Sequence, residues 1–252
     1  MRVTIIGCSG SFPGPENAAS CYLVEAEGFT LMIDLGSGAL GALARYHDVH
    51  DIDAIYISHL HYDHCIDLCG YWVARRFGPE GMMPKIPVYG PADTEAQLAR
   101  ACNLSPGPGI GMQESFDFQT LTPGSFDIGP FAVTTARMNH PTETFGLRIE
   151  QGGAAFAYSA DTGESDTLVR LADQADMFLC EASWSERCLT PDLHLTGREA
   201  GEHAIRAGAD KLVLTHLIPW ETDGPQRTLT AAKESGFSGD ITLAREGDRY
   251  VL

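Results

Sequence analysis

Apolar, β-rich runs alternate along the whole chain with segments of helical periodicity, a pattern typical of an α/β fold. Strands are expected at residues 2–7, 21–25, 30–34, 54–57, 86–91 (with its turn), 131–138, 145–150, 154–159, 177–181 and 211–215, and edge strands at 241–244 and 249–252. Helices are expected at residues 39–46, 63–77, 93–101, 167–175 and 197–207. The last helix has an additional start signal, because Thr196 followed by Glu199 forms a capping box.

Glycine and proline are most frequent in residues 103–115, between two predicted elements. We expect a surface loop here, since segments of this composition connect elements over the outside of a domain. A second hypothesis is that the loop closes over the functional site as a lid.

The composition predicts one domain that spans residues 1–252. Apolar types make up 44% of the chain, and a domain of this size buries about 70–75% of its unfolded surface without needing a disulfide. The seven cysteines show no CxxC pair, so we expect free thiols in a reducing, cytoplasmic compartment. The first apolar run is too short for a secretory signal, and no apolar run is long enough to span a membrane.

The charge balance is strongly acidic, with 17 basic residues against 34 acidic ones and a formal charge of −17. Proteins that bind nucleic acid usually present a basic patch, whereas the only adjacent basic pair here is Arg75-Arg76. A nucleic-acid partner is therefore disfavoured, although local segregation of charge would permit one. A small anionic substrate that is attracted by bound metal ions is compatible with this balance.

Three histidines and an aspartate fall within six residues, shortly after the apolar run 54–57. His59 and His61 alternate as in a strand, so their side chains leave on one face. Asp63 and His64 follow the bend and reach a second point nearby. Imidazole and carboxylate together are typical ligands of zinc, with manganese or iron as alternatives. A histidine-rich surface loop is the other interpretation, and the downstream residues argue against it.

Further metal-ligand types follow three later strands. Each is the first strong ligand type after a run that is predicted to be buried: His140, Asp161 and His216. The ends of strands are where open α/β sheets collect their functional residues. The spacing shows that suitable ligands are present, but it does not assign them to particular metal ions.

The HxHxDH run, with a His, an Asp and a His each closing a later strand, resembles the metallo-β-lactamase superfamily over essentially the whole chain. The resemblance implies an α/β fold, the αββα four-layer metallo-β-lactamase sandwich. It also implies two divalent metal ions, zinc first, with manganese or iron as alternatives. Seven side chains would hold them: His59, His61 and His140 on one ion, Asp63, His64 and His216 on the other, and Asp161 between them. In the superfamily the aspartate that matches Asp34 holds the metal loop in place.

The residue between the two ions bears on the reaction. Many antibiotic-hydrolysing members have a cysteine at the position of Asp161 and a secretory signal, whereas an aspartate is similar to the phosphodiesterase branch. Two metals about 3.5–4 Å apart can share a hydroxide that attacks phosphorus in line. The resemblance therefore implies a dinuclear metal-dependent phosphodiesterase that uses a metal-bridging hydroxide. It gives Asp63 a catalytic as well as a metal-binding role, and β-lactam hydrolysis becomes a minor alternative.

Two further elements resemble ribonuclease Z. Residues 180–183 (CEAS) resemble its HEAT element, and residues 194–196 (HLT) resemble its HxT element. In that family the glutamate orients the histidine, which assists departure of the leaving oxygen. The resemblance implies these catalytic roles for Glu181 and His194. The alternative for His194 is a helix-entry residue without a catalytic role. His203, one turn after Glu199, is expected at the surface.

One departure from ribonuclease Z favours a small substrate. That family has a long arm for transfer RNA between the ligands that match His140 and Asp161, but only twenty residues separate them here. The chain resembles more closely the short relatives, some of which are described as phosphodiesterases of cyclic nucleotides. We therefore expect hydrolysis of a small anionic phosphodiester, with a 3′,5′-cyclic nucleotide such as cyclic AMP as the leading substrate. The alternatives are a ribonuclease Z-like endoribonuclease and a non-catalytic metal-holding module, and the family alone suggests a homodimer.

The predicted mouth of the site has an aromatic candidate. Trp220 follows His216 by four residues and could stack on a nucleobase. A tryptophan shortly after a strand is more often part of the core, which is the alternative interpretation.

Overall fold

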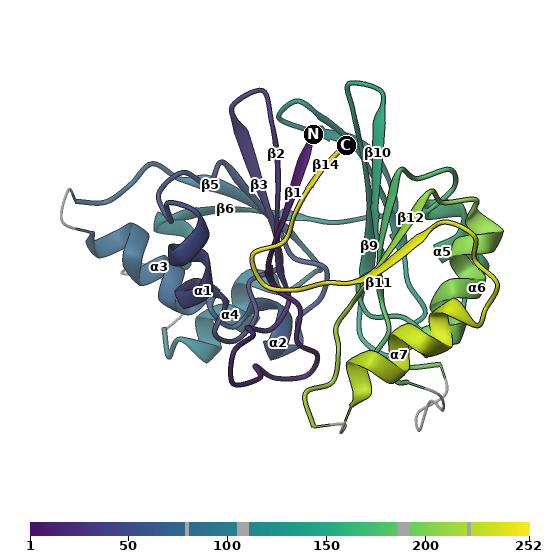
Figure 1. Ribbon diagram of the computed structural model, residues 1–252. Coiled ribbons are helices and arrows are strands. Elements are labelled where there is room, and N and C mark those ends of the chain that lie inside the picture. The colour runs from purple at the N-terminus through teal and green to yellow at the C-terminus, as the bar shows by residue number, and fades with distance from the viewer. Residues whose placement is uncertain (79–80, 105–110, 186–191, 221–222) are drawn as a thin grey trace.

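The computed structural model describes residues 1–78, 81–104, 111–185, 192–220 and 223–252. Within these residues two seven-stranded sheets face each other (Figure 1). The first sheet has the order β14-β1-β2-β3-β4-β5-β6 and consists of Arg2–Gly7 (β1), Cys21–Ala26 (β2), Phe29–Ile33 (β3), Ala54–Tyr56 (β4), Ile86–Gly90 (β5), Phe116–Thr120 (β6) and Arg249–Val251 (β14). The second has the order β13-β12-β11-β10-β9-β8-β7 and consists of Gly124–Ile128 (β7), Phe131–Arg137 (β8), Phe145–Gln151 (β9), Ala154–Tyr158 (β10), Met177–Glu181 (β11), Lys211–Thr215 (β12) and Asp240–Leu243 (β13).

Helices cover the outer face of each sheet. Those on the first sheet are Ala39–Tyr46 (α1), Leu68–Phe77 (α3) and Thr94–Ala101 (α4). Those on the second are Asp166–Leu171 (α5), Gly197–Ala207 (α6) and Gly224–Lys233 (α7). A further short helix, Tyr62–Cys65 (α2), lies at the end of the molecule opposite the two chain termini (Figure 1). None of the helices in the described parts of the chain is long and apolar enough to cross a membrane.

Each central strand contributes to two apolar cores, because alternate side chains point to opposite faces of a sheet. In β3, Leu31 and Ile33 enter the core between the sheets, whereas Met32 enters the core under the helices of the first sheet. In β11, Leu179 faces the first sheet and Phe178 faces the helices of the second. Three apolar cores thus hold four layers of secondary structure together, which confirms the expected αββα four-layer sandwich.

The strand directions bring the predicted site residues to one end of the sandwich. Strands β3 to β6 are parallel to one another, and so are β10 to β13. Their carboxyl ends therefore lie at one edge of each sheet. The metal loop follows β4, and further site residues follow β8, β10, β11 and β12. In Figure 1 this is the end of the molecule that contains α2.

Within the described residues, the structure contains four elements that the sequence pattern did not predict: β6, β7, α7 and the 3-10 helix Met112–Glu114 (η1). The two strands lie at sheet edges, where one partner is missing and polar side chains stay exposed. Their sequences, FDFQT and GSFDI, contain only two apolar residues each, which is too few for a pattern to predict a strand. Helix 167–175 was also predicted too long, since α5 ends at Leu171.

The single helix predicted for residues 63–77 is wrong, because the structure has α2 and α3 separated by a break. The backbone N–H of Asp67 donates to the carbonyl oxygen of Leu35 at 3.1 Å, outside the helix. The Asp67 carboxylate accepts a hydrogen bond from the N–H of Leu40 at 2.9 Å. These contacts dock the junction on the segment after β3, so Asp63 and His64 lie on a separate helical turn.

Two cysteines are paired rather than free. A disulfide joins Cys69 of α3 to Cys102 after α4, with Cα atoms 5.7 Å apart. Packing of α3 against α4 brings these distant positions within the range that a disulfide requires, which the spacing alone could not reveal. The expectation of free thiols is therefore wrong for this pair, and Cys188 lies outside the described residues. The remaining cysteines are free and buried: Cys8, Cys21, Cys65 and Cys180.

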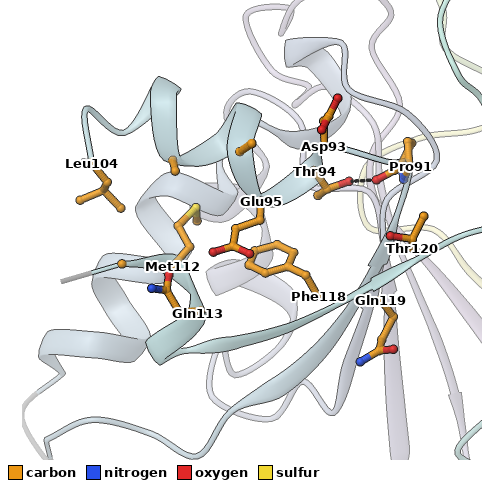
Figure 2. Close-up of a pocket in the computed structure, with 13 residues that line it drawn as sticks. Pro91, Asp93, Thr94, Glu95, Leu104, Met112, Gln113, Phe118, Gln119 and Thr120 are labelled. Atoms are coloured by element: carbon orange, nitrogen blue, oxygen red, sulfur yellow. Dashed lines mark hydrogen bonds between the residues drawn. The ribbon is translucent and has the colours of Figure 1, made fainter. Parts of the chain in front are cut away.

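The described part of segment 103–115 packs against the protein instead of forming an open surface loop. Met112 is fully buried, and the carbonyl oxygen of Gly111 accepts a hydrogen bond from the Trp72 indole at 3.1 Å. Gly111 and Met112 line a pocket of about 450 Å³ together with α4 and Phe118 (Figure 2). None of the predicted metal ligands lines this pocket. Residues 105–110, on which the lid hypothesis mainly rests, lie outside the described residues.

Helix α6 packs closely on α7 because Gly197, at the start of α6, has no side chain. A Cβ atom there would lie 2.2 Å from the carbonyl oxygen of Thr228 in α7, a backbone atom that cannot move alone. We expect Gly197→Ala to lower the free energy of unfolding by about 1–3 kcal/mol through overpacking. Thermal unfolding followed by circular dichroism would show this as a lower Tm.

Gly41→Ala is the matched control. Gly41 is exposed in α1, with no atom within 4 Å of the position of its Cβ. Alanine there should raise stability by about 0.5–1 kcal/mol, because it loses less backbone entropy in a helix. An unchanged or higher Tm for Gly197→Ala would contradict the close packing of α6 on α7.

Candidate metal centre

The loop after β4 is held from both sheets. The backbone N–H of Ser58 donates a hydrogen bond of 2.7 Å to Asp34, which directly follows β3. The carbonyl oxygen of Ser58 accepts a hydrogen bond of 3.0 Å from the N–H of Phe145 in β9. From the helix layer, the Gln97 amide donates to the carbonyl oxygen of Leu60 at 2.6 Å. The backbone positions of His59 and His61 are therefore fixed by neighbours on several sides.

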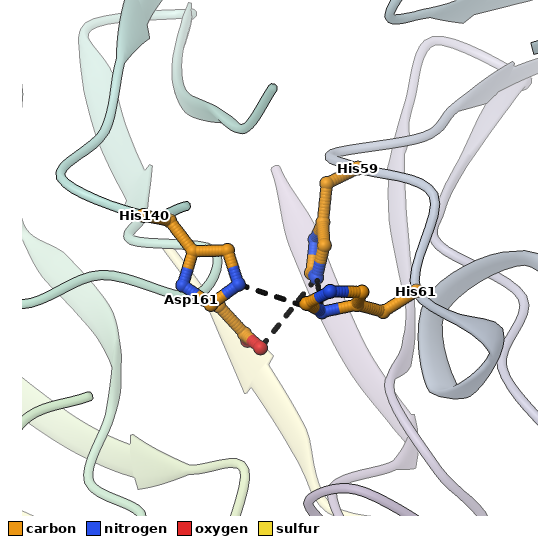
Figure 3. Close-up of side chains that lie close together, drawn as sticks. All are labelled: His59, His61, His140 and Asp161. Atoms are coloured by element: carbon orange, nitrogen blue, oxygen red, sulfur yellow. Dashed lines mark hydrogen bonds and ion pairs between the residues drawn. The ribbon is translucent and has the colours of Figure 1, made fainter. Parts of the chain in front are cut away.

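Four predicted ligands form a first group: His59, His61, His140 and Asp161. Figure 3 shows their side chains pointing toward one another from segments that are far apart in the sequence. Nε2 of His59 lies 3.0 Å from Nδ1 of His61, and Nε2 of His140 lies 3.4 Å from the same atom. Oδ2 of Asp161 lies 3.6 Å from Nε2 of His59. All four ligand atoms lie within 4.8 Å of one another.

A second group shares Asp161 with the first and adds Asp63, His64 and His216. Oδ2 of Asp63 lies 3.1 Å from Nε2 of His216 and 3.5 Å from Nε2 of His64. Oδ1 of Asp161 lies 3.2 Å from Nε2 of His64 and 3.4 Å from Nε2 of His216. The two carboxylate oxygens of Asp161 thus face different groups. All seven predicted metal ligands are brought together, although which ion each would hold stays a prediction.

Hydrogen bonds on the outer ring nitrogens orient the histidines. Nδ1 of His64 donates to Asp34 at 2.8 Å, and Nδ1 of His140 donates to the carbonyl oxygen of Leu193 at 3.1 Å. Nδ1 of His216 lies 2.8 Å from the Ser183 hydroxyl. Because the outer nitrogen carries the proton in His64 and His140, a neutral ring presents the lone pair of Nε2 to the centre.

The donor set fits a bound cation. Nε2 of His64 and Oδ1 of Asp161 are buried, and apart from their mutual ion-pair contact at 3.2 Å neither makes a regular hydrogen bond among the described residues. Unpaired buried polar atoms are costly, and here several of them converge on the same space. A divalent cation would satisfy them together, and neutral imidazole with carboxylate suits zinc, manganese or iron.

The protonation states support this fit, with one exception. Burial lowers the pKa of His59 well below its usual value, so this ring is neutral. Burial by itself would raise the pKa of Asp161, but the neighbouring histidines, His216 first, hold it well below its usual value. His64 differs, since Asp161 and two other carboxylates raise its pKa well above the usual value in spite of burial. A cation that binds there must displace a proton, so metal binding should strengthen as the pH rises.

Asp34 connects the metal loop to both sheets. Its Oδ2 accepts hydrogen bonds from the Ser58 hydroxyl at 2.8 Å, from Nδ1 of His64 at 2.8 Å and from the Tyr158 hydroxyl at 2.9 Å. The residue is fully buried. These bonds confirm the expectation that Asp34 holds the metal loop in place.

Glu181 and His194 lie beside both groups. Oε1 of Glu181 accepts from Nδ1 of His194 at 2.9 Å, and the His194 ring stacks on His216 with centroids 5.3 Å apart. The centroid of the His140 ring is 5.6 Å away. Burial would lower the pKa of His194, but the Glu181 carboxylate raises it to about 9. His194 is therefore protonated at neutral pH.

Sequence reasoning did not identify two contacts that complete the centre. The Ser183 hydroxyl donates to Oε2 of Glu181 at 2.9 Å and also contacts His216. The backbone N–H of Ser11 donates to Oδ2 of Asp63 at 2.8 Å. Ser183 closes the CEAS element, so this motif was a usable signal. The donor at Ser11 is a backbone N–H, so the residue type gives no sign of this contact. The glycines of the loop after β1 permit the backbone to come this close to Asp63.

The expectation that His203 lies at the surface is wrong, since it is only 1% exposed. Its Nδ1 donates to the carbonyl oxygen of Glu199 at 2.8 Å, and its Nε2 accepts from the N–H of Ser165 at 3.2 Å. Ser165 is the N-cap of α5. The ring therefore links α6 to the start of α5, a contact that helical spacing alone does not reveal.

We expect Asp34→Asn to weaken zinc binding by about 10–100-fold, the usual effect of losing an outer partner of a metal ligand. An amide nitrogen at the position of Oδ2 would face three donors, those of Ser58, His64 and Tyr158. Competition with a chromogenic chelator measures the change. Asp176→Asn is the control, because Asp176 caps the N–H of Ala155 at the far end of β10. Equal zinc affinity in the two variants would contradict the role of Asp34.

Comparison with known proteins identifies the family. The profile of the Beta-lactamase superfamily domain matches residues 30–217. An uncharacterised protein of Mycobacterium tuberculosis is 44% identical over 245 residues, which cover 96% of this chain and 88% of that protein. A ribonuclease Z of Halorubrum lacusprofundi is 25% identical, over 98% of this chain and 96% of that protein.

The probable metallo-hydrolase YhfI of Bacillus subtilis is 32% identical over 253 residues, with 98% of both chains covered. The crystal structure of YhfI superposes with a TM-score of 0.85 at 29% identity, over 99% of this chain and 98% of that chain. The family expected from the HxHxDH run is thus confirmed. The chain is a member of the β-lactamase superfamily and, within it, a metallo-hydrolase.

Proposed function

We propose that this protein is a dinuclear metal-dependent phosphodiesterase of small substrates, with a 3′,5′-cyclic nucleotide such as cyclic AMP as the leading candidate. The observation that carries the proposal is a double ligand group that shares Asp161, with His194, which is hydrogen-bonded to Glu181, beside it. When bound, a pair of divalent cations would supply Lewis-acid chemistry for attack on phosphorus. An aspartate between the groups, in place of a cysteine, favours the phosphodiesterase branch.

His194 is suited to act as the general acid. Its Nδ1 donates to Glu181, so in this role the proton that goes to the substrate would come from Nε2. Water adds to phosphorus as the P–O3′ bond breaks, the proton of Nε2 goes to the departing 3′ oxygen, and the proton that the water loses then restores the protonated form of His194. Glu181 stabilises the protonated ring and fixes its orientation, because it also accepts hydrogen bonds from Ser183 and from the N–H of Thr162. An acid placed in this way typically contributes about 10²–10⁴ in rate.

The segment between His140 and Asp161 supports a small substrate. It is occupied by β9 and β10, which pair as a plain antiparallel hairpin. No long arm for a transfer RNA interrupts it, and the chain has a formal charge of −17. Binding of a long polyanion requires many phosphate contacts from basic side chains. A small phosphodiester needs few such contacts.

A second candidate function is a ribonuclease Z-like endoribonuclease. It is favoured by the relative of that name and by the pairing of Glu181 with His194, which matches the HEAT and HxT elements. A non-catalytic metal-holding module is a third possibility.

A substrate panel separates these functions. Zinc- or manganese-loaded protein should hydrolyse cyclic AMP to 5′-AMP, and bis(p-nitrophenyl) phosphate as a generic diester, but not a transfer RNA precursor. Products are resolved by anion-exchange chromatography and denaturing gels. Cleavage of the RNA alone would replace the proposal with the endoribonuclease. No turnover of any substrate by metal-loaded protein would favour the non-catalytic module.

The pH profile tests the acid. Glu181→Gln removes the charge that raises the pKa of His194 to about 9, so this pKa should fall. The ring then loses its proton at a lower pH, and the alkaline limb of kcat should shift to lower pH by the same amount. Histidine NMR of the metal-free protein measures the pKa independently of activity.

His194→Ala should lower kcat by about 10²–10⁴-fold while the zinc content stays unchanged. Glu234→Gln is the control for Glu181→Gln, because it neutralises an exposed carboxylate that pairs with Arg198 on the outer helices. An alkaline limb that stays in place in Glu181→Gln, or normal turnover in His194→Ala, would remove the catalytic role of His194.

A further inference from the structure

Two aromatic rings at the site end of the molecule are stacked on each other and largely exposed. Phe12 and Trp220 have centroids 5.0 Å apart and ring planes at 17°. Phe12 is 46% exposed and Trp220 is 53% exposed. An exposed aromatic ring does not contribute the favourable free energy that its burial would provide. Here two rings from distant parts of the chain are both held exposed to solvent.

Other parts of the chain show what an aromatic pair with a purely structural role looks like. Phe77 of α3 is 57% exposed, but it meets Trp72 edge to face, with centroids 5.8 Å apart, and Trp72 is only 7% exposed. In that pair one ring belongs to the core and the other covers it. In the Phe12–Trp220 pair neither ring belongs to the core, so covering the core does not explain the pair.

The two loops that carry the rings are joined by backbone contacts. Ser9 and Leu217 form a parallel β-bridge. The N–H of Gly10 donates to the carbonyl oxygen of Leu217 at 3.0 Å, and the N–H of Leu217 donates to that of Cys8 at 3.0 Å. The Ser9 hydroxyl donates to the carbonyl oxygen of Phe12 at 2.7 Å. The Phe12 ring is thus presented from a fixed backbone, which lowers the entropy lost when a ligand binds.

The same loops contact the second ligand group directly. The N–H of Ser11, adjacent to Phe12, donates to Oδ2 of Asp63 at 2.8 Å. A Cβ atom at Gly10 would lie 2.9 Å from Nδ1 of His216, so the first loop lies close against this histidine. Trp220 follows His216 by four residues. The aromatic pair is therefore carried by loops that contact Asp63 and His216.

We infer that Phe12 and Trp220 form a base-binding wall that selects phosphodiesters carrying a nucleobase. The inference rests on the proposed phosphodiesterase function and specifies its substrate class. A phosphate at the ligand groups would place the rest of a small nucleotide beside these loops, where the planar base stacks on the aromatic rings. Stacking tolerates any base and is stronger for larger ring systems, so purine nucleotides should bind better than pyrimidine nucleotides.

This mode of recognition fits the charge of the protein. Stacking uses the π-face of the base and needs no cationic side chain. A chain with a formal charge of −17 can thereby distinguish a nucleotide from other small phosphate esters without a basic patch.

Equilibrium binding of 5′-AMP and of ribose 5-phosphate to zinc-loaded protein tests the wall, since ribose 5-phosphate has a hydroxyl group at C1 where 5′-AMP carries adenine. Isothermal titration calorimetry should give about tenfold tighter binding of 5′-AMP, within the range for one stacked base. In Phe12→Leu and Trp220→Leu this ratio should fall toward one. Trp220→Phe keeps an aromatic face and should retain most of the preference, which excludes general damage to the loop.

Phe77→Leu is the matched control, because it removes an equally exposed ring that also contacts a tryptophan but lies outside the wall. It should leave the ratio unchanged. A ratio that is the same in all variants, or no binding of either ligand, would overturn the inference even if cyclic AMP is hydrolysed. A ratio that falls as expected in a protein that does not hydrolyse cyclic AMP would retain the wall and overturn the proposed function.

Discussion

The buried carboxylate of Asp161 sets the constraint on which the site depends. It lies among imidazole nitrogens from both ligand groups, and its Oδ1 makes no regular hydrogen bond among the described residues. Burial of this carboxylate is costly unless positive charge lies next to it, and either a protonated His64 or a bound cation would supply that charge. Asp34, Leu193 and Ser183 act outside the ligand groups by holding the outer nitrogens of the histidines, so that the inner nitrogens converge.

The fold provides this convergence because the ligands come from two different sheets. The metal loop follows β4 of the first sheet, whereas the other three ligands follow β8, β10 and β12 of the second. Cations held between them would join the two halves of the sandwich, and the free energy of metal binding would then contribute to the stability of the fold. Glu181 and His194 lie beside the ligand groups and the loops of Phe12 and Trp220 contact them, so the proposed proton transfer and base recognition would both take place beside the centre.

The chemistry of the centre was predictable from the sequence to the extent that it depends on residue type and spacing. His59, His61, Asp63 and His64 fall in one short run, but pairing them with ligands of the second sheet required the family resemblance. Contacts that depend on tertiary packing were not predictable, as the Cys69–Cys102 disulfide and the burial of His203 show. The edge strands β6 and β7 were missed because each has only two apolar residues, so the alternation is too short to be distinguished from a loop.

Anomalous diffraction from zinc-loaded crystals, recorded at the zinc absorption edge, tests the central claim most directly. We predict two zinc peaks per chain, one among His59, His61 and His140 and one among Asp63, His64 and His216, with an oxygen of Asp161 facing each. A centre with no zinc, or zinc bound only at other positions, would contradict the conclusion that these side chains converge to hold cations.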